Sequence, residues 1–311
     1  MTPSVSRDRA LGLLLGGALG DALGAPFEGR AAVDAAEIAA VERAANPLAH
    51  TDDTALTLAL AAHLAARRDD HGGLVDPDAL ARELAAAWRA EPWRGYGPGA
   101  ARVFELIDNG TPWRAAASAA FGGAGSFGNG AAMRVAPVAL VTTSARQAAE
   151  LGARTGELTH AHEHGRFGAA TQAAAAYLAL RGDPARPVDV TRFLRELHRA
   201  VPSRPWHEKL NRVAELVRTA AEPEHAARAL GNDVSALGSV PAAVLAFLQH
   251  PDDPVATLRY ALRVAGDADT IAAMAGALAG ARCGAGAFPR AWVDRLEAAA
   301  ALHELAGRLA G

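Results

Sequence analysis

Residues 267–283 read DADTIAAMAGALAGARC, an acidic and hydroxylated start followed by a run of small apolar residues. Alanine has the highest helix propensity of any residue, and leucine is close behind it. Residues 272–276, AAMAG, are mostly alanine and glycine, and such small residues let helix backbones approach one another closely. Residues 16–18, Gly-Gly-Ala, form a second such face near the other end of the chain. The spacing predicts a helix over 270–283 with small residues along its surface.

The rest of the chain has the same helical character. Hydrophobic residues make up 50% of the 311 residues and aromatic residues only 5%. Apolar residues recur three and four positions apart, and no convincing set of alternating strands is present. We predict an all-α fold in a single compact domain, residues 1–311, because no low-complexity linker divides the chain. Turn and proline signals place the other helices at 7–23, 52–68, 77–90, 98–109, 112–121, 129–141, 145–157, 162–181, 189–201, 206–220, 222–230, 237–249, 254–264 and 289–309.

Composition and charge exclude several classes of protein. The single cysteine, Cys283, excludes an internal disulfide framework and any multi-cysteine zinc or iron–sulfur site. A net charge of -3 argues against sequence-independent nucleic-acid binding, which needs a basic surface. Glycines and Asp21 interrupt the N-terminal apolar run, so neither a signal peptide nor a membrane span is expected. We expect a soluble, cytoplasmic and monomeric protein.

Two acidic helix starts lie far apart in the sequence. Residues 51–54, TDDT, precede an apolar helix just as residues 267–270, DADT, do. Capping of free N–H groups explains one carboxylate in each, and a protein in which every aspartate is a cap would be purely structural. A fold that joins the two starts would gather four carboxylates, which repel one another unless a cation neutralises them. Such oxygen ligands suit Mg²⁺, Mn²⁺ or Ca²⁺, and four of them fit two ions better than one.

Other polar segments are ambiguous when taken singly. Asp21 lies in an apolar helix and is interpreted as a buried group that accepts from a nearby backbone N–H, while Glu28 follows in a loop. Residues 122–134, GGAGSFGNGAAMR, feed a predicted helix start, which favours either an anion site or a flexible loop. Residues 159–164, THAHEH, lack an obvious fourth ligand for zinc. Tyr96 lies in a turn, where its ring could stack on a planar group.

Taken in order, these segments resemble the ADP-ribosylglycohydrolase family, of the dinitrogenase-reductase-activating glycohydrolase type. The resemblance covers nearly the whole chain, in the stretches LLGGALGDALGAPFEG, HTDDTALTLAL, RGYGPG, SFGNGAAMRVAP, THAHEHG and AGDADTIAAMAGALAGA. It implies an all-α orthogonal helical bundle and a binuclear site for two divalent cations, Mg²⁺ or Mn²⁺. It also implies hydrolysis of the bond between ADP-ribose and an acceptor.

The resemblance implies roles for individual residues. Glu28 matches the glutamate that family members place beside the metals, either for proton transfer or for gating the site. The implied metal ligands are Thr51, Asp52, Asp53, Asp267, Asp269 and Thr270. The implied catalytic residues are Glu28, Asp52, Asp53 and Asp269. The implied substrate-binding residues are Tyr96, Gly97, Ser126, Phe127, Gly128, Asn129, Gly130, Met133 and His160.

Two positions depart from the family pattern. The last family motif usually reads GGDTDT, and here Ala265 replaces a glycine and Ala268 a threonine. The loss of a hydroxyl at Ala268 could weaken support for the metal ligands. It also leaves open an ADP-ribose-binding module without catalysis. We expect an ADP-ribosylated protein as substrate and ADP-ribose as product, with arginine as the modified residue. The alternative acceptors are serine, a small molecule and a nucleic acid. A nucleic acid is expected only as a modified substrate.

Overall fold

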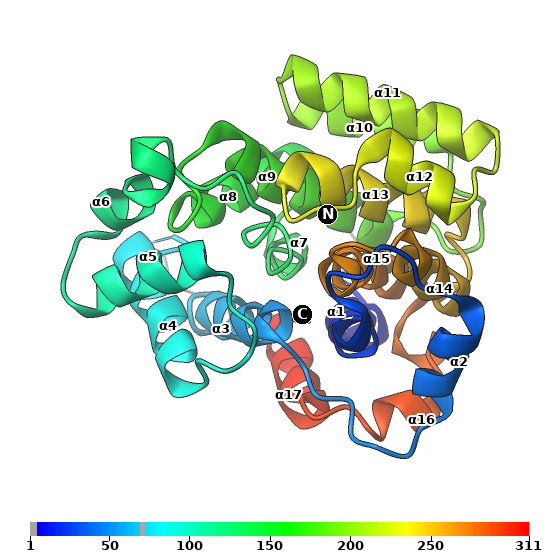
Figure 1. Cartoon of the computed structure of the whole chain (residues 1–311), viewed down its shortest axis with the longest axis horizontal. Coiled ribbons are helices and arrows are strands. Elements are labelled where there is room, and N and C mark those ends of the chain that lie inside the picture. The colour runs from blue at the N-terminus through cyan, green and yellow to red at the C-terminus, as the bar shows by residue number, and fades with distance from the viewer. Residues whose placement is uncertain (1–4, 69–72, 311) are drawn as a thin grey trace.

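Two helices in the middle of the molecule lie against each other with almost no side chains between them. The computed structural model describes residues 5–68 and 73–310, and α1 (Arg7–Gly24) runs antiparallel to α15 (Ala268–Cys283) (Figure 1). A Cβ on Gly16 would lie 2.1 Å from the carbonyl oxygen of Gly276, and one on Gly280 would lie 1.9 Å from that of Gly12. No larger residue fits at these positions, so glycine sets the distance between the two helices.

The other helices surround this pair. α15 also packs against α9 (Glu163–Arg181), α13 (Ala236–Gln249) and α14 (Pro254–Val264), and its side chains are buried on all faces. Seventeen α-helices and no β-strand are present in the described residues, which confirms the predicted all-α class. The remaining α-helices are α2 (Ala35–Arg43), α3 (Asp52–Ala66), α4 (Pro77–Ala90), α5 (Pro98–Asp108), α6 (Trp113–Ser118), α7 (Val138–Val141), α8 (Ala145–Glu157), α10 (Val190–Ala200), α11 (Arg204–Arg218), α12 (Pro223–Leu230), α16 (Arg290–Val293) and α17 (Ala299–Leu309), and the 3-10 helices are η1 (Ala25–Phe27), η2 (Ala120–Gly123) and η3 (Ala285–Ala287).

The layout brings the beginnings of α3 and α15 together. α3 lies beside both α1 and α17, and α4, α5 and α6 extend from it in the left part of Figure 1. α10, α11 and α12 lie on the opposite side, where α11 and α12 cover α13. Because α1 contacts α3 as well as α15, it holds the two acidic helix starts at a fixed separation.

Three helix predictions are wrong in part. The helix predicted over 129–141 is present only as α7, because Asn129 pairs its backbone N–H with Val234 at 2.9 Å and the chain then continues in tight turns. The helix predicted over 289–309 is divided into α16 and α17, because backbone pairing with Leu48 occupies the residues between them. The helix predicted over 112–121 ends at Ser118.

One helix was missed. α2 begins after Asp34, whose side chain accepts from the N–H of Glu37, while the Glu37 side chain accepts from the N–H of Asp34. This reciprocal capping box was readable in the sequence as an acidic residue followed three positions later by glutamate.

The first helix is as apolar as many membrane-spanning segments. In the described part of the chain, residues 7–27 are long and apolar enough to cross a membrane by length and composition alone. The glycines and Asp21 therefore do not interrupt the run as strongly as the sequence analysis expected. Within this stretch, 78% of an 18-residue apolar window is buried inside the molecule, so packing in the core accounts for its apolar character.

Candidate metal centre

The two acidic helix starts meet at one point. Thr51 caps α3, and Asp267 occupies the capping position of α15. The Thr270 hydroxyl donates to the Asp53 carboxylate over 3.2 Å, although the two residues are 217 positions apart. The structure therefore joins the segments TDDT and DADT, as the sequence analysis required for a shared site.

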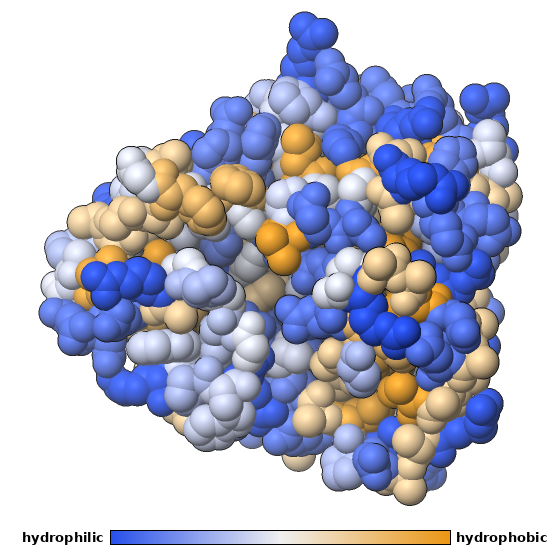
Figure 2. All heavy atoms as spheres, viewed as in Figure 1, coloured by the Kyte–Doolittle hydropathy of each residue, from blue (hydrophilic) through white to orange (hydrophobic). Residues whose placement is uncertain are grey.

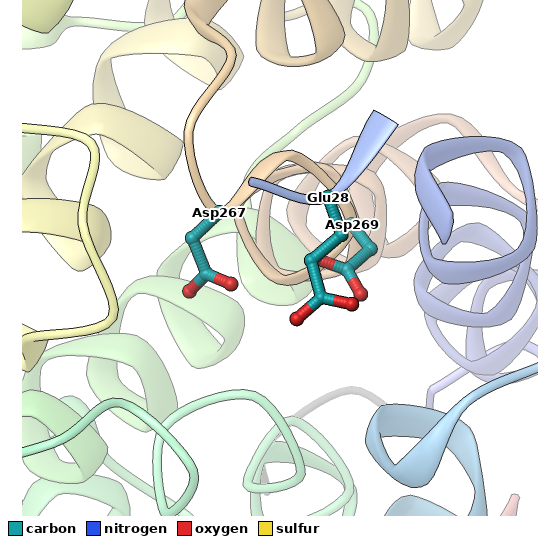
Figure 3. Close-up of side chains that lie close together, drawn as sticks. All are labelled: Glu28, Asp267 and Asp269. Carbon is teal, nitrogen blue, oxygen red and sulfur yellow. The ribbon is translucent and has the colours of Figure 1, made fainter. Parts of the chain in front are cut away.

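Glu28 joins the carboxylates of the α15 start. One carboxylate oxygen from each of Glu28, Asp267 and Asp269 lies within 4.8 Å of the others, and the three side chains point to the same side (Figure 3). Backbone pairing of Gly29 with Gly266 at 2.7 Å holds the Glu28 loop in this place. Asp267 and Asp269 lie on either side of Ala268, the residue at which α15 begins. Their carboxylates nevertheless face a common space.

Asp21 organises the start of α3 from within α1. It is fully buried, and its carboxylate accepts from the Thr51 N–H at 3.1 Å, the Thr51 hydroxyl at 2.8 Å and the Thr54 N–H at 3.1 Å. Its interpretation as a buried, satisfied group is right. The sequence did not show that its partners flank Asp52 and Asp53, so that Asp21 fixes the direction of both carboxylates.

The carboxylates are costly to ionise in this place. Burial, reinforced by neighbouring carboxylates, raises the pKa of Asp52 to about 7 and that of Asp269 to about 8. Burial also raises the pKa of Asp267 to about 6 and that of Asp53 well above its ordinary value. Within the described residues, no arginine, lysine or histidine forms an ion pair with any of these groups. The cluster therefore lacks the positive charge that would let it ionise at neutral pH.

The donor set fits a hard divalent cation. The Asp53 Oδ1 atom is buried and has no hydrogen-bond partner. Buried polar atoms in folded proteins nearly always have a partner, so an orphaned carboxylate oxygen beside other carboxylates indicates a ligand position. Carboxylate and hydroxyl oxygens suit Mg²⁺, Mn²⁺ or Ca²⁺. A cation here would give Asp53 Oδ1 a partner and neutralise the cluster.

The pH dependence of stability tests this assignment. In the metal-free protein, Asp52, Asp267 and Asp269 keep protons up to about pH 7, 6 and 8, whereas the unfolded chain releases them near pH 3.8. The free energy of unfolding should therefore fall as pH rises through this window. A divalent cation replaces the protons, so we expect Mg²⁺ or Mn²⁺ to raise Tm much more at pH 8.5 than at pH 5.5. Thermal unfolding in chelator and in metal across this range measures the effect, and equal shifts at both pH values would contradict it.

The Gly-rich loop does not have the geometry that the sequence predicted. No helix begins at Asn129, so the helix start that the sequence predicted for this loop is wrong. Instead the buried Asn129 side-chain amide donates to the Ser239 hydroxyl at 2.9 Å and to the Asp267 carboxylate. Ser126 is also buried, and its hydroxyl accepts from the Gly128 N–H at 3.2 Å. The loop thus borders the acidic cluster and holds one of its carboxylates.

Large apolar side chains are exposed on the loops around the cluster. In the described chain, those that are largely exposed are Trp93, Phe121, Phe127 and Val234. The Phe121 and Phe127 rings lie 5.0 Å apart, and Phe121 has a φ of 51°, a left-handed backbone that bulky residues rarely adopt. Figure 2 shows a mainly polar face with a few hydrophobic residues beside a hollow near its middle. The aromatic pair offers a planar group a stacking surface.

Tyr96 and Gly97 lie beside the α3 start. The Arg94 carbonyl accepts from the Asp52 N–H at 2.8 Å, which joins this loop to the cluster. Tyr96 packs edge-on against Phe104 at 6.1 Å between ring centres, so its ring already has a planar neighbour in the core. Its hydroxyl is buried without a partner, and Gly97 caps α5.

The remaining residues predicted to bind substrate lie in the Gly-rich segment or against it. Met133 and His160 are buried, and a Cβ on Gly130 would lie 3.1 Å from the His160 ring. His162 caps α9 and lies 5.9 Å from the Phe127 ring. None of the three histidines in residues 159–164 belongs to a group of potential metal ligands in the described chain.

The two departures from the family pattern have different consequences. Ala265 has a φ of 60° and a ψ of -159°, a conformation that glycine adopts readily and alanine does not. The alanine is therefore strained at the turn that leads into Asp267. Ala268 is fully buried at the first position of α15, so a threonine hydroxyl at this position would be shielded from solvent.

Comparisons with known proteins point in one direction. A family model described as ADP-ribosylglycohydrolase matches residues 2–311. ADP-ribosylhydrolase ARH3 from Gallus gallus is 33% identical over 96% of this chain and 93% of its own length. The ADP-ribosyl-[dinitrogen reductase] glycohydrolase of Rhodospirillum rubrum is 29% identical over 95% of this chain and 92% of its own. A solved structure described as an ADP-ribosylglycohydrolase-related protein complex has a TM-score of 0.73 and 28% identity, and covers 97% of both chains.

Proposed function

The chain belongs to the ADP-ribosylglycohydrolase family and is a glycosyl hydrolase of that family, and on this premise we propose that it removes ADP-ribose from a modified acceptor with the help of two divalent cations. The observation that carries the proposal is the joined acidic cluster with its orphaned Asp53 oxygen. Helix capping alone would not gather the carboxyl groups of Asp52, Asp53, Asp267 and Asp269 close enough to raise one another's pKa, with Asp21 and Glu28 beside them. A cytoplasmic location and a monomeric state remain part of this proposal.

The proposed ligands are the residues that the two helix starts bring together. They are Thr51, Asp52, Asp53, Asp267, Asp269 and Thr270. Bound there, Mg²⁺ or Mn²⁺ would supply positive charge for the ribose hydroxyls and lower the pKa of a bound water. The protein keeps these side chains aligned through Asp21 on one side and Asn129 on the other.

Glu28 is the exposed carboxylate of the group. It caps the short helix η1 and is accessible to solvent, whereas Asp53, Asp267 and Asp269 are buried. An accessible carboxylate can reach both water and a leaving group, so Glu28 is the candidate for proton transfer at the scissile bond. Gating of the site is its alternative role. In either role, nearby carboxylates stabilise the positive charge that develops on the sugar during glycoside hydrolysis.

The proposal also concerns the acceptor, the group from which ADP-ribose is removed. The sequence resemblance to the dinitrogenase-reductase type leads to arginine, and the Rhodospirillum rubrum relative is named for ADP-ribosyl-[dinitrogen reductase]. Relatives named ARH3 nevertheless share higher identity, up to 34% for that of Danio rerio. This higher identity makes the substrate of the ARH3 relatives the second candidate, beside the arginine linkage that the sequence motifs suggest. We therefore test an arginine-linked and a serine-linked substrate side by side.

The direct test is release of free ADP-ribose from proteins modified on arginine or on serine. Each substrate is incubated with the enzyme in Mg²⁺, in Mn²⁺ and in chelator. We expect release from one of them in metal and a loss of at least about 10³-fold in chelator, since metal ions supply several kcal/mol of transition-state stabilisation. Equal release in chelator would overturn the metal proposal. Tight ADP-ribose binding with no release from any conjugate, small molecules and nucleic acid included, would favour a binding module.

A further inference from the structure

One nitrogen of His160 faces the Gly-rich loop. A Cβ on Gly130 would lie 3.2 Å from His160 Nε2, and one on Gly128 would lie 3.6 Å from it. The Ser126 hydroxyl lies 3.3 Å from the same Gly128 position. Because the two glycines carry no side chains, Nε2 is left uncovered on this side. Whether that nitrogen donates or accepts a hydrogen bond depends on the tautomer of the imidazole.

A chain of hydrogen bonds sets the tautomer from the other side of the ring. Arg134 Nη2 donates to the Thr159 hydroxyl at 2.8 Å, and a guanidinium can only donate. The Thr159 hydroxyl lies 2.7 Å from His160 Nδ1. Thr159 is buried, so its own hydrogen needs an acceptor, and within the described residues that acceptor is Nδ1. Nδ1 therefore accepts, and the hydrogen of the neutral ring resides on Nε2.

Arg134 is held firmly enough to impose this direction. Its side chain is buried and also donates to the Gly130 carbonyl at 2.6 Å and to the Thr155 carbonyl at 3.3 Å. The same arginine thus anchors the Gly-rich loop and orients the Thr159 hydroxyl. Burial, together with the charge of Arg134, lowers the pKa of His160 to about 3, so the ring stays neutral.

We propose that Thr159, oriented by Arg134, is a positioning residue that holds His160 as the Nε2–H tautomer, so that His160 donates a hydrogen bond to a ligand oxygen above the Gly-rich loop. The Ser126 hydroxyl accepts from Gly128, which leaves its hydrogen as a second donor at the same place. Two neutral donors suit a phosphate or sugar oxygen. The identity of that ligand as ADP-ribose rests on the proposed function, whereas the tautomer does not.

The tautomer is tested first on the metal-free, ligand-free protein. Long-range ¹H–¹⁵N correlation spectra of protein with ¹⁵N-labelled histidine show which ring nitrogen carries the hydrogen, and His160→Gln identifies the signal. We expect a protonated Nε2 and an unprotonated Nδ1 from pH 6 to pH 8. A protonated Nδ1, or a doubly protonated ring, would overturn the proposal whether or not the protein hydrolyses anything.

Substitutions then test the role of Thr159. Thr159→Val keeps the size of the side chain but removes its hydroxyl, whereas Thr159→Ser keeps the hydroxyl. In Thr159→Val we expect a mixture of tautomers and about tenfold weaker binding of ADP-ribose in Mg²⁺, measured by calorimetry, the value of one hydrogen bond. Thr159→Ser should retain the wild-type tautomer and bind within about twofold. A wild-type tautomer and affinity in Thr159→Val would refute the positioning role.

Discussion

Asp53→Asn should lose at least about 10³-fold in kcat/KM for ADP-ribose release while making the metal-free protein more stable. Asparagine has the same size and keeps an oxygen that can accept from Thr270, but it carries no charge. The charge is what a divalent cation needs, and it is also what Asp21, Asp269 and Asp52 repel. In chelator at pH 8, we expect a higher Tm than in the wild type, because burial and the neighbouring carboxylates raise the pKa of Asp53 well above its ordinary value and asparagine removes that cost. Turnover and thermal unfolding, with and without Mg²⁺, measure the two effects.

Asp78→Asn is the matched control. Asp78 is the second residue of α4, the position that Asp53 occupies in α3, but it is exposed on the surface. It should lose only the helix-dipole contribution of about 0.3–1 kcal/mol and leave turnover and the response to metal unchanged. Should Asp53→Asn behave in the same way, Asp53 acts only as a first-turn helix residue and the metal proposal fails.

The sequence predicted the residues of the site better than their arrangement. Two Thr/Asp segments before apolar helices were visible as a pair, and chemistry alone led from their carboxylates to a divalent cation. The role of Asp21 was not visible, because its partners Thr51 and Thr54 lie on another helix. Local pattern identifies a polar residue in an apolar helix, but it does not show which distant segment satisfies that residue.

The Gly-rich loop shows where pattern reasoning failed. Residues 129–137 have helical composition, but the Asn129 N–H bonds to the distant Val234 carbonyl, and the buried Arg134 side chain bonds to the Gly130 carbonyl within the segment. The resemblance assigns Asn129 to the substrate, and pattern alone did not show that its amide also contacts Asp267. Tertiary hydrogen bonds override helix propensity here, since propensity differences are small beside buried polar contacts. By contrast, the small residues of α1 and α15 indicated close packing correctly, because glycine has few other uses inside a helix.

Gly16→Ala should destabilise the protein by about 3 kcal/mol or more, or prevent its folding, although alanine favours helix more than glycine does. The added Cβ would lie 2.1 Å from the Gly276 carbonyl oxygen, which belongs to a backbone and cannot move aside alone. α1 and α15 would have to separate, and overpacking of this kind costs about 1–3 kcal/mol even where side chains can adjust. Because α15 carries Asp267 and Asp269 at its start, metal binding should weaken as well.

Gly17, the neighbour of Gly16, provides the matched control for this prediction. A Cβ on Gly17 would meet its nearest neighbours at 3.6 Å, an ordinary contact distance. Gly17→Ala should therefore stabilise the protein by about 0.5–1 kcal/mol through helix propensity. Two identical substitutions at adjacent positions of one helix then have opposite signs, and denaturant unfolding of both variants measures the difference. Propensity alone predicts the same sign for both, so a shared gain in stability would mean that α1 and α15 do not touch at Gly16. A shared loss would mean that Gly17 is also in close contact.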